Sequence, residues 1–133
     1  MLKLKKTFAA SAIALLTLSS TYTYAEVTAN AAATSNYLWR GQEQTGGDAA
    51  IQGGIDYANE SGFYAGTWVS NASWAEDMTY ELDLYAGFGG DINETVSYDV
   101  GYIYYAYPDA ASSADADFSE IYGSISMGSF TFG

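Results

Sequence analysis

Polar and apolar side chains alternate with a period of two along most of the chain after residue 25. In the segment 79–89, for example, Leu82 and Leu84 alternate with Glu81 and Asp83. Because successive side chains of a strand point to opposite faces, this period predicts strands that have one apolar and one polar face. On the apolar faces we expect contact with lipid.

Seven segments carry this signal and are bounded by residues that favour turns. They are predicted at 27–40, 50–58, 63–71, 79–89, 96–107, 117–127 and from 130 onward. The longer ones run to about 10 to 13 residues, whereas a tilted strand needs about 9–11 to cross a bilayer and soluble strands average about 5–6. The fold class expected is therefore all-β, an antiparallel meander of long strands forming part of a transmembrane outer-membrane β-barrel.

The connections between these segments alternate in length. Those at 41–49, 72–78 and 108–116 are long, and those at 59–62, 90–95 and 128–129 are shorter. Bacterial barrels join their strands by short periplasmic turns and longer outer loops. With the N-terminus in the periplasm, every long connection falls on the outside.

The N-terminal residues predict export. Lys3, Lys5 and Lys6 precede an apolar run at 8–18, and small residues lead up to Ala25. A run of about 11 residues is shorter than the roughly 20 needed for a membrane-spanning helix, so it indicates a cleaved signal peptide. The expected organisation is a signal peptide, 1–25, and a partial, truncated barrel domain, 26–133.

Charge and residue usage narrow the function. Once the signal is removed, Arg40 is the single basic residue against 16 acids, which disfavours nucleic acid as a partner. The chain has no Cys and no His, which excludes thiolate chemistry, Ser-His hydrolases and most zinc sites but leaves carboxylate-only catalysis open. No spacing of the acids recommends such chemistry, so the expectation is no catalytic residues, no metal, no cofactor and no enzyme activity. The expected partners are outer-membrane lipid, lipopolysaccharide, and small solutes or cations.

Six charged residues fall on the predicted polar faces and are candidates for lining a lumen. They are Arg40, Asp56, Glu81, Asp83, Asp99 and Glu120. Carboxylates dominate this set, and acidic rings favour cations in channels. Arg40 is expected to pair with Glu81 or Asp83, either as a charge at a pore constriction or as a structural ion pair near the outer end of the first strand.

Three blocks of sequence also resemble a known family. They are TSNYLWRG at 34–41, AIQGGIDY at 50–57 with ESGFYAG at 60–66, and YELDLYAG at 80–87. Together they are similar to the opening of the TorF-type porins, also described as the Gcw_chp family of bacterial proteins of unknown function, although Asn36 stands where that family usually has Asp. The resemblance implies an outer-membrane barrel with a pore and no catalytic residues. This sequence also departs from the family in stopping at about half the family's length.

The function expected is a porin in the outer membrane of a Gram-negative bacterium, allowing passive diffusion of small solutes with a preference for cations. Seven strands are an odd number and the last has only begun at Phe130, so a fragment of a longer barrel is also expected. The alternative is a secreted, soluble β-sandwich that binds carbohydrate, with Trp39, Trp68 and Trp74 as a stacking platform.

Overall fold

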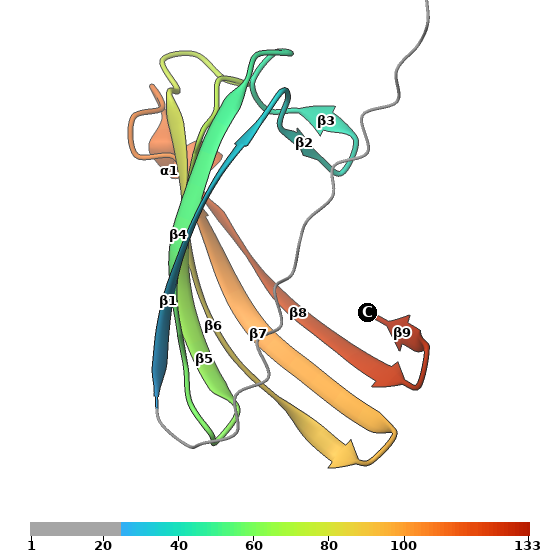
Figure 1. Ribbon diagram of the computed structural model, residues 1–133. Helices are drawn as coiled ribbons and strands as arrows, with labels where there is room; N and C mark the ends of the chain where they lie inside the picture. The colour runs from blue at the N-terminus through green and yellow to red at the C-terminus, as the bar shows by residue number, and fades with distance from the viewer. Residues whose placement is uncertain (1–24) are drawn as a thin grey trace, which may run out of the picture.

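The computed structural model describes residues 25–133, which form one strongly curved antiparallel sheet (Figure 1). The predicted signal segment, apart from Ala25, lies outside the described residues. Seven strands follow one another in the order β1-β4-β5-β6-β7-β8-β9, and each pairs antiparallel with the next. The expected all-β antiparallel meander is confirmed.

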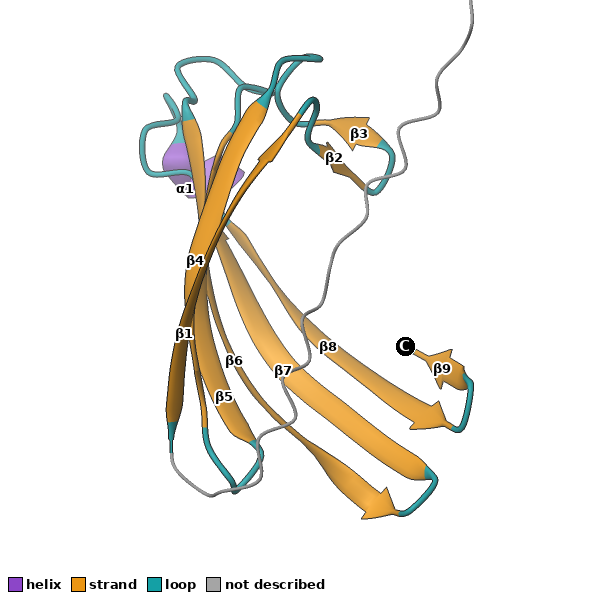
Figure 2. Cartoon of the chain, in the orientation of Figure 1, coloured by secondary structure: helices purple, strands orange, loops and turns teal. Residues whose placement is uncertain are grey.

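Strands account for nearly all the regular structure (Figure 2). The sheet contains β1 (Glu26–Thr34), β4 (Ala50–Ala58), β5 (Phe63–Asn71), β6 (Tyr80–Asn93), β7 (Val96–Ala106), β8 (Phe118–Met127) and β9 (Phe130–Phe132). A separate hairpin pairs β2 (Leu38–Trp39) with β3 (Gln42–Glu43), and a single helical turn forms α1 (Ser113–Ala116). Among residues 25–133, no helix is long and apolar enough to cross a membrane.

The short connections lie at one end of the sheet and the long ones at the other (Figure 1). At the short-turn end, Gly62 has a φ of +86°, a left-handed conformation that glycine adopts without steric cost. Between β6 and β7, the Asn93 side chain accepts hydrogen bonds from the backbone N–H groups of Thr95 and Val96, at 3.0 and 3.1 Å. Local turn chemistry therefore produces the predicted alternation of lengths.

Two predicted boundaries are wrong. The first segment, expected as one strand over 27–40, ends in the sheet at Thr34, after which the chain turns away to form the β2–β3 hairpin. The segment expected at 79–89 continues to Asn93, through a register shift between Asp91 and Asn93. The strands β4 and β5 have the predicted bounds.

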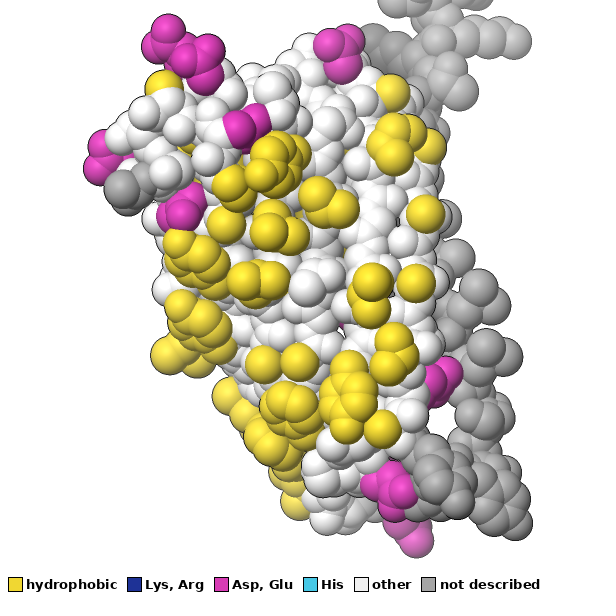
Figure 3. Space-filling view, turned by 90° about the vertical axis from the view of Figure 1, so that its left-hand side faces the viewer, with side chains coloured by type: hydrophobic (Ala, Val, Ile, Leu, Met, Phe, Trp, Pro, Cys, Tyr) yellow, Lys and Arg dark blue, Asp and Glu magenta, His cyan; other side chains and the backbone are white. Residues whose placement is uncertain are grey.

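The two faces of the sheet differ in chemistry. The convex face, called the outer face below, exposes large apolar side chains such as Ile51, Leu84 and Ile121, the last of them 83% exposed. In Figure 3, apolar side chains cover the middle of this face, and acidic ones gather toward its ends and margin. The register places every charged residue of the seven-stranded sheet on the opposite, concave face, called the inner face: Glu26, Asp56, Glu81, Asp83, Asp91, Asp99 and Glu120.

A small core lies where the long connections meet the sheet. Ala72 and Met78 from the 72–79 connection pack with Tyr105 and Tyr107, against partly buried side chains that include Phe118. This cluster fixes the long-loop end of the sheet and the side chains that extend from it over the inner face.

Candidate functional site on the inner face

Tyrosine rings lie flat across glycines in the centre of the inner face. One row across four strands reads Tyr64, Gly87, Gly101 and Tyr122. The two rings lean toward each other over the glycines, so that their hydroxyl oxygens meet at 2.6 Å. A Cβ at Gly87 or Gly101 would collide with these rings, which is why the row needs glycine there.

Acidic side chains hold these hydroxyl groups. The Tyr64 hydroxyl donates to Asp99 Oδ1 at 3.0 Å. In the next row, Tyr85 lies over Gly66 and its hydroxyl donates to Asp56. The inner face is therefore a hydrogen-bonded layer of phenols and carboxylates, in which each ring lies over a glycine of the neighbouring strand.

Toward the long-loop end the carboxylates become buried. Glu81 is 1% exposed and accepts hydrogen bonds from the hydroxyl groups of Tyr37 and Tyr107, at 3.0 and 2.9 Å. Asp83 is 6% exposed, and its Oδ1 has no hydrogen-bond partner among residues 25–133. Two acids of one strand are therefore buried side by side on the inner face.

Glu81 affects the pKa of the two tyrosines that donate hydrogen bonds to it, Tyr37 and Tyr107. Burial, followed by the nearby charge of Glu81, raises the pKa of Tyr37 well above its usual range. The same two causes raise the pKa of Tyr107. Both hydroxyl groups therefore remain protonated at any physiological pH and serve as donors to the carboxylate.

The β2–β3 hairpin lies over the inner face and carries Arg40. The Arg40 guanidinium makes a two-pronged ion pair with Glu120 on β8, with both N–O distances 2.7 Å. It also stacks on the Trp39 ring, 4.1 Å from the ring centroid. The hydrogen bond to Glu120 raises the pKa of Arg40 above its normal value, so the guanidinium stays charged.

The structure therefore corrects the expected partner of Arg40. Neither Glu81 nor Asp83 contacts the guanidinium, because Tyr37 occupies Glu81 and the hairpin extends past both acids to Glu120. Of the six sequence candidates, Arg40 and Glu120 form one pair and Glu81 and Asp83 lie together. Asp56 and Asp99 hold separate tyrosines.

Sequence reasoning missed the tyrosines as members of this site. Tyr85 and Tyr122 alternate in phase with the acids of their own strands, which was a usable signal. What could not be read was the glycine opposite each ring, since that depends on the pairing register between strands.

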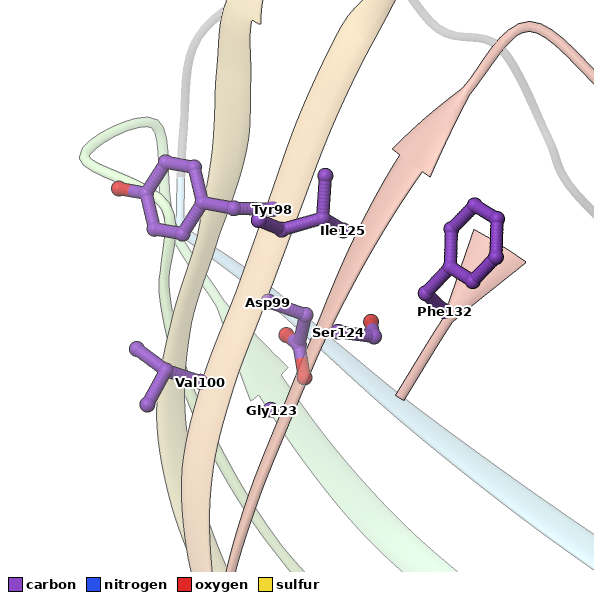
Figure 4. Close-up of a pocket in the computed structure, with 7 residues that line it drawn as sticks. All are labelled: Tyr98, Asp99, Val100, Gly123, Ser124, Ile125 and Phe132. Carbon is purple, nitrogen blue, oxygen red and sulfur yellow. The ribbon is translucent and has the colours of Figure 1, made fainter. Parts of the chain in front are cut away.

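Other features do not add a site. A shallow hollow of about 450 Å³ is lined by Tyr98, Asp99, Val100, Gly123, Ser124, Ile125 and Phe132 (Figure 4). Most of these residues belong to the outer face, with only Asp99 and Ser124 on the inner face, so the hollow is a shallow apolar depression between β7, β8 and β9. Within residues 25–133, no three His, Cys or acidic residues converge in a way that could hold a metal ion.

Comparison with known proteins places the chain in a family. Neither the curated proteins nor the solved structures contain a match to it. The family model described as a bacterial protein of unknown function, Gcw_chp, matches residues 18–132. Since that match covers most of the sequence, the chain belongs to the Gcw_chp family.

Proposed function

We propose that this protein forms part of the wall of an outer-membrane β-barrel of the TorF porin type, whose lumen passes small solutes with a preference for cations. In this proposal the outer face contacts lipid and the inner face lines the lumen. The signal-like N-terminus would bring the chain to the Gram-negative outer membrane.

The observation that carries the proposal is the separation of chemistry between the two faces. Every charged residue of the seven-stranded sheet lies on the inner face, while Ile55, Val100 and Ile125 are about half exposed or more on the outer face. In water, such a large exposed apolar surface is unfavourable and rare on a monomeric protein. In a bilayer the same arrangement is the expected one, because lipid covers the apolar face and water fills the lumen.

Strand length and connectivity support the same function. The strands β6, β7 and β8 have 14, 11 and 10 residues, enough to cross the hydrocarbon on a tilt, which takes about 9–11 residues. Short turns at one end and long connections at the other match the periplasmic and outer ends of bacterial barrels.

The preference for cations follows from the charges on the inner face. Asp56 and Asp99 carry no basic partner among the described residues, and Arg40 compensates Glu120 alone, whereas Glu81 and Asp83 are buried. A lumen lined in this way attracts cations and repels anions.

The carbohydrate-binding alternative lacks the architecture that it requires. A sandwich needs two sheets packed face to face, whereas residues 25–133 form one seven-stranded sheet and a two-stranded hairpin. The three tryptophans do not form a common platform either, since Trp39 packs on Tyr105, Trp68 on Tyr37 and Trp74 on Tyr107.

Conductance measurements test the proposal. The protein, expressed with its own N-terminus in a Gram-negative host, should fractionate with outer membranes. After reconstitution in planar bilayers, it should conduct and show a reversal potential of cation-selective sign in a salt gradient. A protein that fractionates with the soluble periplasm, or never conducts, would overturn the pore, and an anion-selective potential would overturn the cation preference.

A further inference from the structure

From the placement of the β2–β3 hairpin, we infer that residues 37–44, called the inner hairpin, form a constriction at the long-loop end of the proposed pore, with the Arg40–Glu120 ion pair as its clasp. This inference rests on the proposed pore function. Beyond that function, it names the segment that narrows the pore and the ion pair that holds this segment in place. It also predicts how both affect conductance and ion selectivity.

The inner hairpin spans the concave side of the sheet instead of extending away from it. It follows β1 at one margin, yet Arg40 reaches Glu120 on β8. Five strand spacings separate β1 from β8 in the sheet, roughly 24 Å along the surface at about 4.8 Å per strand. In Figure 1, β2 and β3 lie on the open, concave side near the long-loop end.

Contacts along the inner hairpin fall on successive strands. The Tyr37 ring meets Trp68 on β5 edge to face, at 5.4 Å between centroids, and its hydroxyl reaches Glu81 on β6. The Trp39 ring packs on Tyr105 of β7, at 6.0 Å. The segment therefore crosses the inner face strand by strand, occupying space that a solute in the lumen would otherwise use.

The base of the inner hairpin is fixed. Gln44 and Thr45 are 5% and 2% exposed, and the Gln44 N–H donates to the Tyr37 carbonyl at 2.8 Å. The Gln44 carbonyl in turn accepts from the Ser73 N–H at 2.8 Å, which joins the base to the 72–79 connection. Movement of the whole segment would require these buried bonds to break.

The tip is held differently. Arg40 and Gly41 have φ values of +48° and +82°, as in the tight two-residue turn that suits a hairpin. The Arg40 side chain is 60% exposed and that of Glu120 is 29% exposed, so the ion pair at the tip stands in water and is screened by salt. Buried hydrogen bonds therefore hold the base, whereas the packing of Trp39 on Tyr105 and this exposed ion pair hold the tip.

Arg40 also sets the charge at this point. It is the single basic residue in 25–133, and it neutralises Glu120 on β8, two strands from the buried acids Glu81 and Asp83 on β6. Removing the guanidinium frees the Glu120 carboxylate and releases the tip together. The inference therefore predicts that conductance and cation preference rise in the same variant.

The first test separates the charge from the turn. Arg40→Asn removes the guanidinium and keeps a residue that tolerates a left-handed backbone. Single-channel conductance should rise about twofold or more, with the reversal potential shifting further toward cations. The control is Glu60→Gln, which removes an exposed acid from the short 59–62 turn at the opposite end of the sheet, and which should behave as wild type.

Charge exchange tests the clasp itself. Glu120→Gln should raise conductance as Arg40→Asn does, and the double variant Arg40→Glu with Glu120→Arg should return it toward the wild-type value. A double variant as open as either single change would contradict a clasp held by this pair.

A reversible lock tests the position of the inner hairpin without relying on charge. Because the chain has no native Cys, Arg40→Cys with Glu120→Cys leaves two thiols that a short, reducible bifunctional reagent can bridge. Bridging should lower the conductance of this double variant and reduction should restore it, while each single-Cys variant treated with the same reagent should show neither change.

The outcomes distinguish the two proposals. If wild type conducts but Arg40→Asn and the bridged variant conduct as wild type does, the constriction is overturned and the pore stands. If the two thiols are not bridged at all, the inner hairpin does not lie against β8 and the inference fails whatever the conductance. If no form conducts, both the pore and the constriction are overturned.

Discussion

The two faces of this sheet invert the usual distribution of residues in a soluble protein. The outer face leaves Ile51, Leu84 and Ile121 exposed, whereas the inner face buries Glu81 and Asp83. In a water-soluble sheet the apolar face is covered and the charged face is solvated, because removing apolar area from water stabilises the fold and burying charge opposes it. In the barrel that we propose, this distribution is expected, because the solvent changes from lipid on the outer face to water on the inner one.

The faces also differ in how they are packed. Outer side chains stand apart along the strands, and β8 alternates between exposed and partly buried at every position. Inner side chains are joined by hydrogen bonds, as between Tyr64, Tyr122 and Asp99. Three pairs of substitutions measure this difference, and one substitution in a loop then tests the response to acid.

The largest difference in stability is expected between a charge placed on the outer face of β1 and one placed on its inner face. Ala31 and Ala32 are neighbouring exposed alanines near the middle of the strand, and the register puts Ala31 on the outer face and Ala32 on the inner one. Ala31→Lys should destabilise the reconstituted protein by about 2–4 kcal/mol, the range for Lys at mid-membrane, while Ala32→Lys should be tolerated. Denaturant unfolding in vesicles and the yield of assembled protein measure both, and equal effects would contradict the assignment of faces.

A smaller effect is expected for a methyl group under the tyrosines. A Cβ at Gly87 would meet the Tyr64 ring and lie 2.6 Å from the Val100 carbonyl oxygen, so Gly87→Ala should destabilise by about 1–3 kcal/mol through overpacking. The control is Gly123→Ala on the outer face, where the nearest atom is an ordinary 3.5 Å away. If unfolding midpoints fall equally for both, the rings do not need their glycines.

Removal of one hydroxyl from each face should give a smaller difference still. Tyr122→Phe deletes the bond to the Tyr64 hydroxyl and should destabilise by about 0.5–1.5 kcal/mol, the usual net value of a hydrogen bond. Tyr102→Phe on the outer face is the matched change, at a side chain that is 48% exposed, and it should leave stability unchanged. A loss at Tyr102 comparable with that at Tyr122 would remove the distinction between the faces.

The smallest expected effect is on the stability of the protein at low pH. The outer face of the sheet has no carboxylate, so sensitivity to low pH must come from the inner face and the loops. Hydrogen bonds from Thr79 hold the pKa of Asp109 below its ordinary value. Since a depressed folded-state pKa stabilises above the unfolded pKa of about 3.9, the contribution is present at neutral pH and is lost as pH falls through the folded value.

Asp109→Asn should therefore lower stability slightly at neutral pH, with the difference from wild type disappearing in acid. Unfolding curves recorded from neutral to strongly acidic pH test this. A difference that grows as the pH falls would contradict the sign of the effect.

The outcome of sequence reasoning differed between strands and loops. The bounds of β4 and β5 were predicted correctly, because the period of two is local and a Gly-containing turn joins them. The chain from Ser35 to Arg40 was wrongly joined to β1, since Tyr37 and Trp39 keep the apolar phase of that strand even though Ser35 and Leu38 interrupt it. Its departure from the sheet depends on contacts with Trp68, Glu81 and Glu120, which are distant in sequence.

What the sequence determined by itself was the pattern along each strand: which positions are apolar, which are acidic, where turns occur, and that residues 26–133 hold one basic residue and 16 acids. What only the tertiary structure decided was how the strands align. The register brings Gly87 and Gly101 beneath Tyr64 and Tyr122, and the curvature lets Arg40 reach Glu120 instead of the nearer acids. The physical reason is that alternation is set by backbone geometry within a strand, whereas ring placement and ion pairing depend on free energies summed over several strands at once.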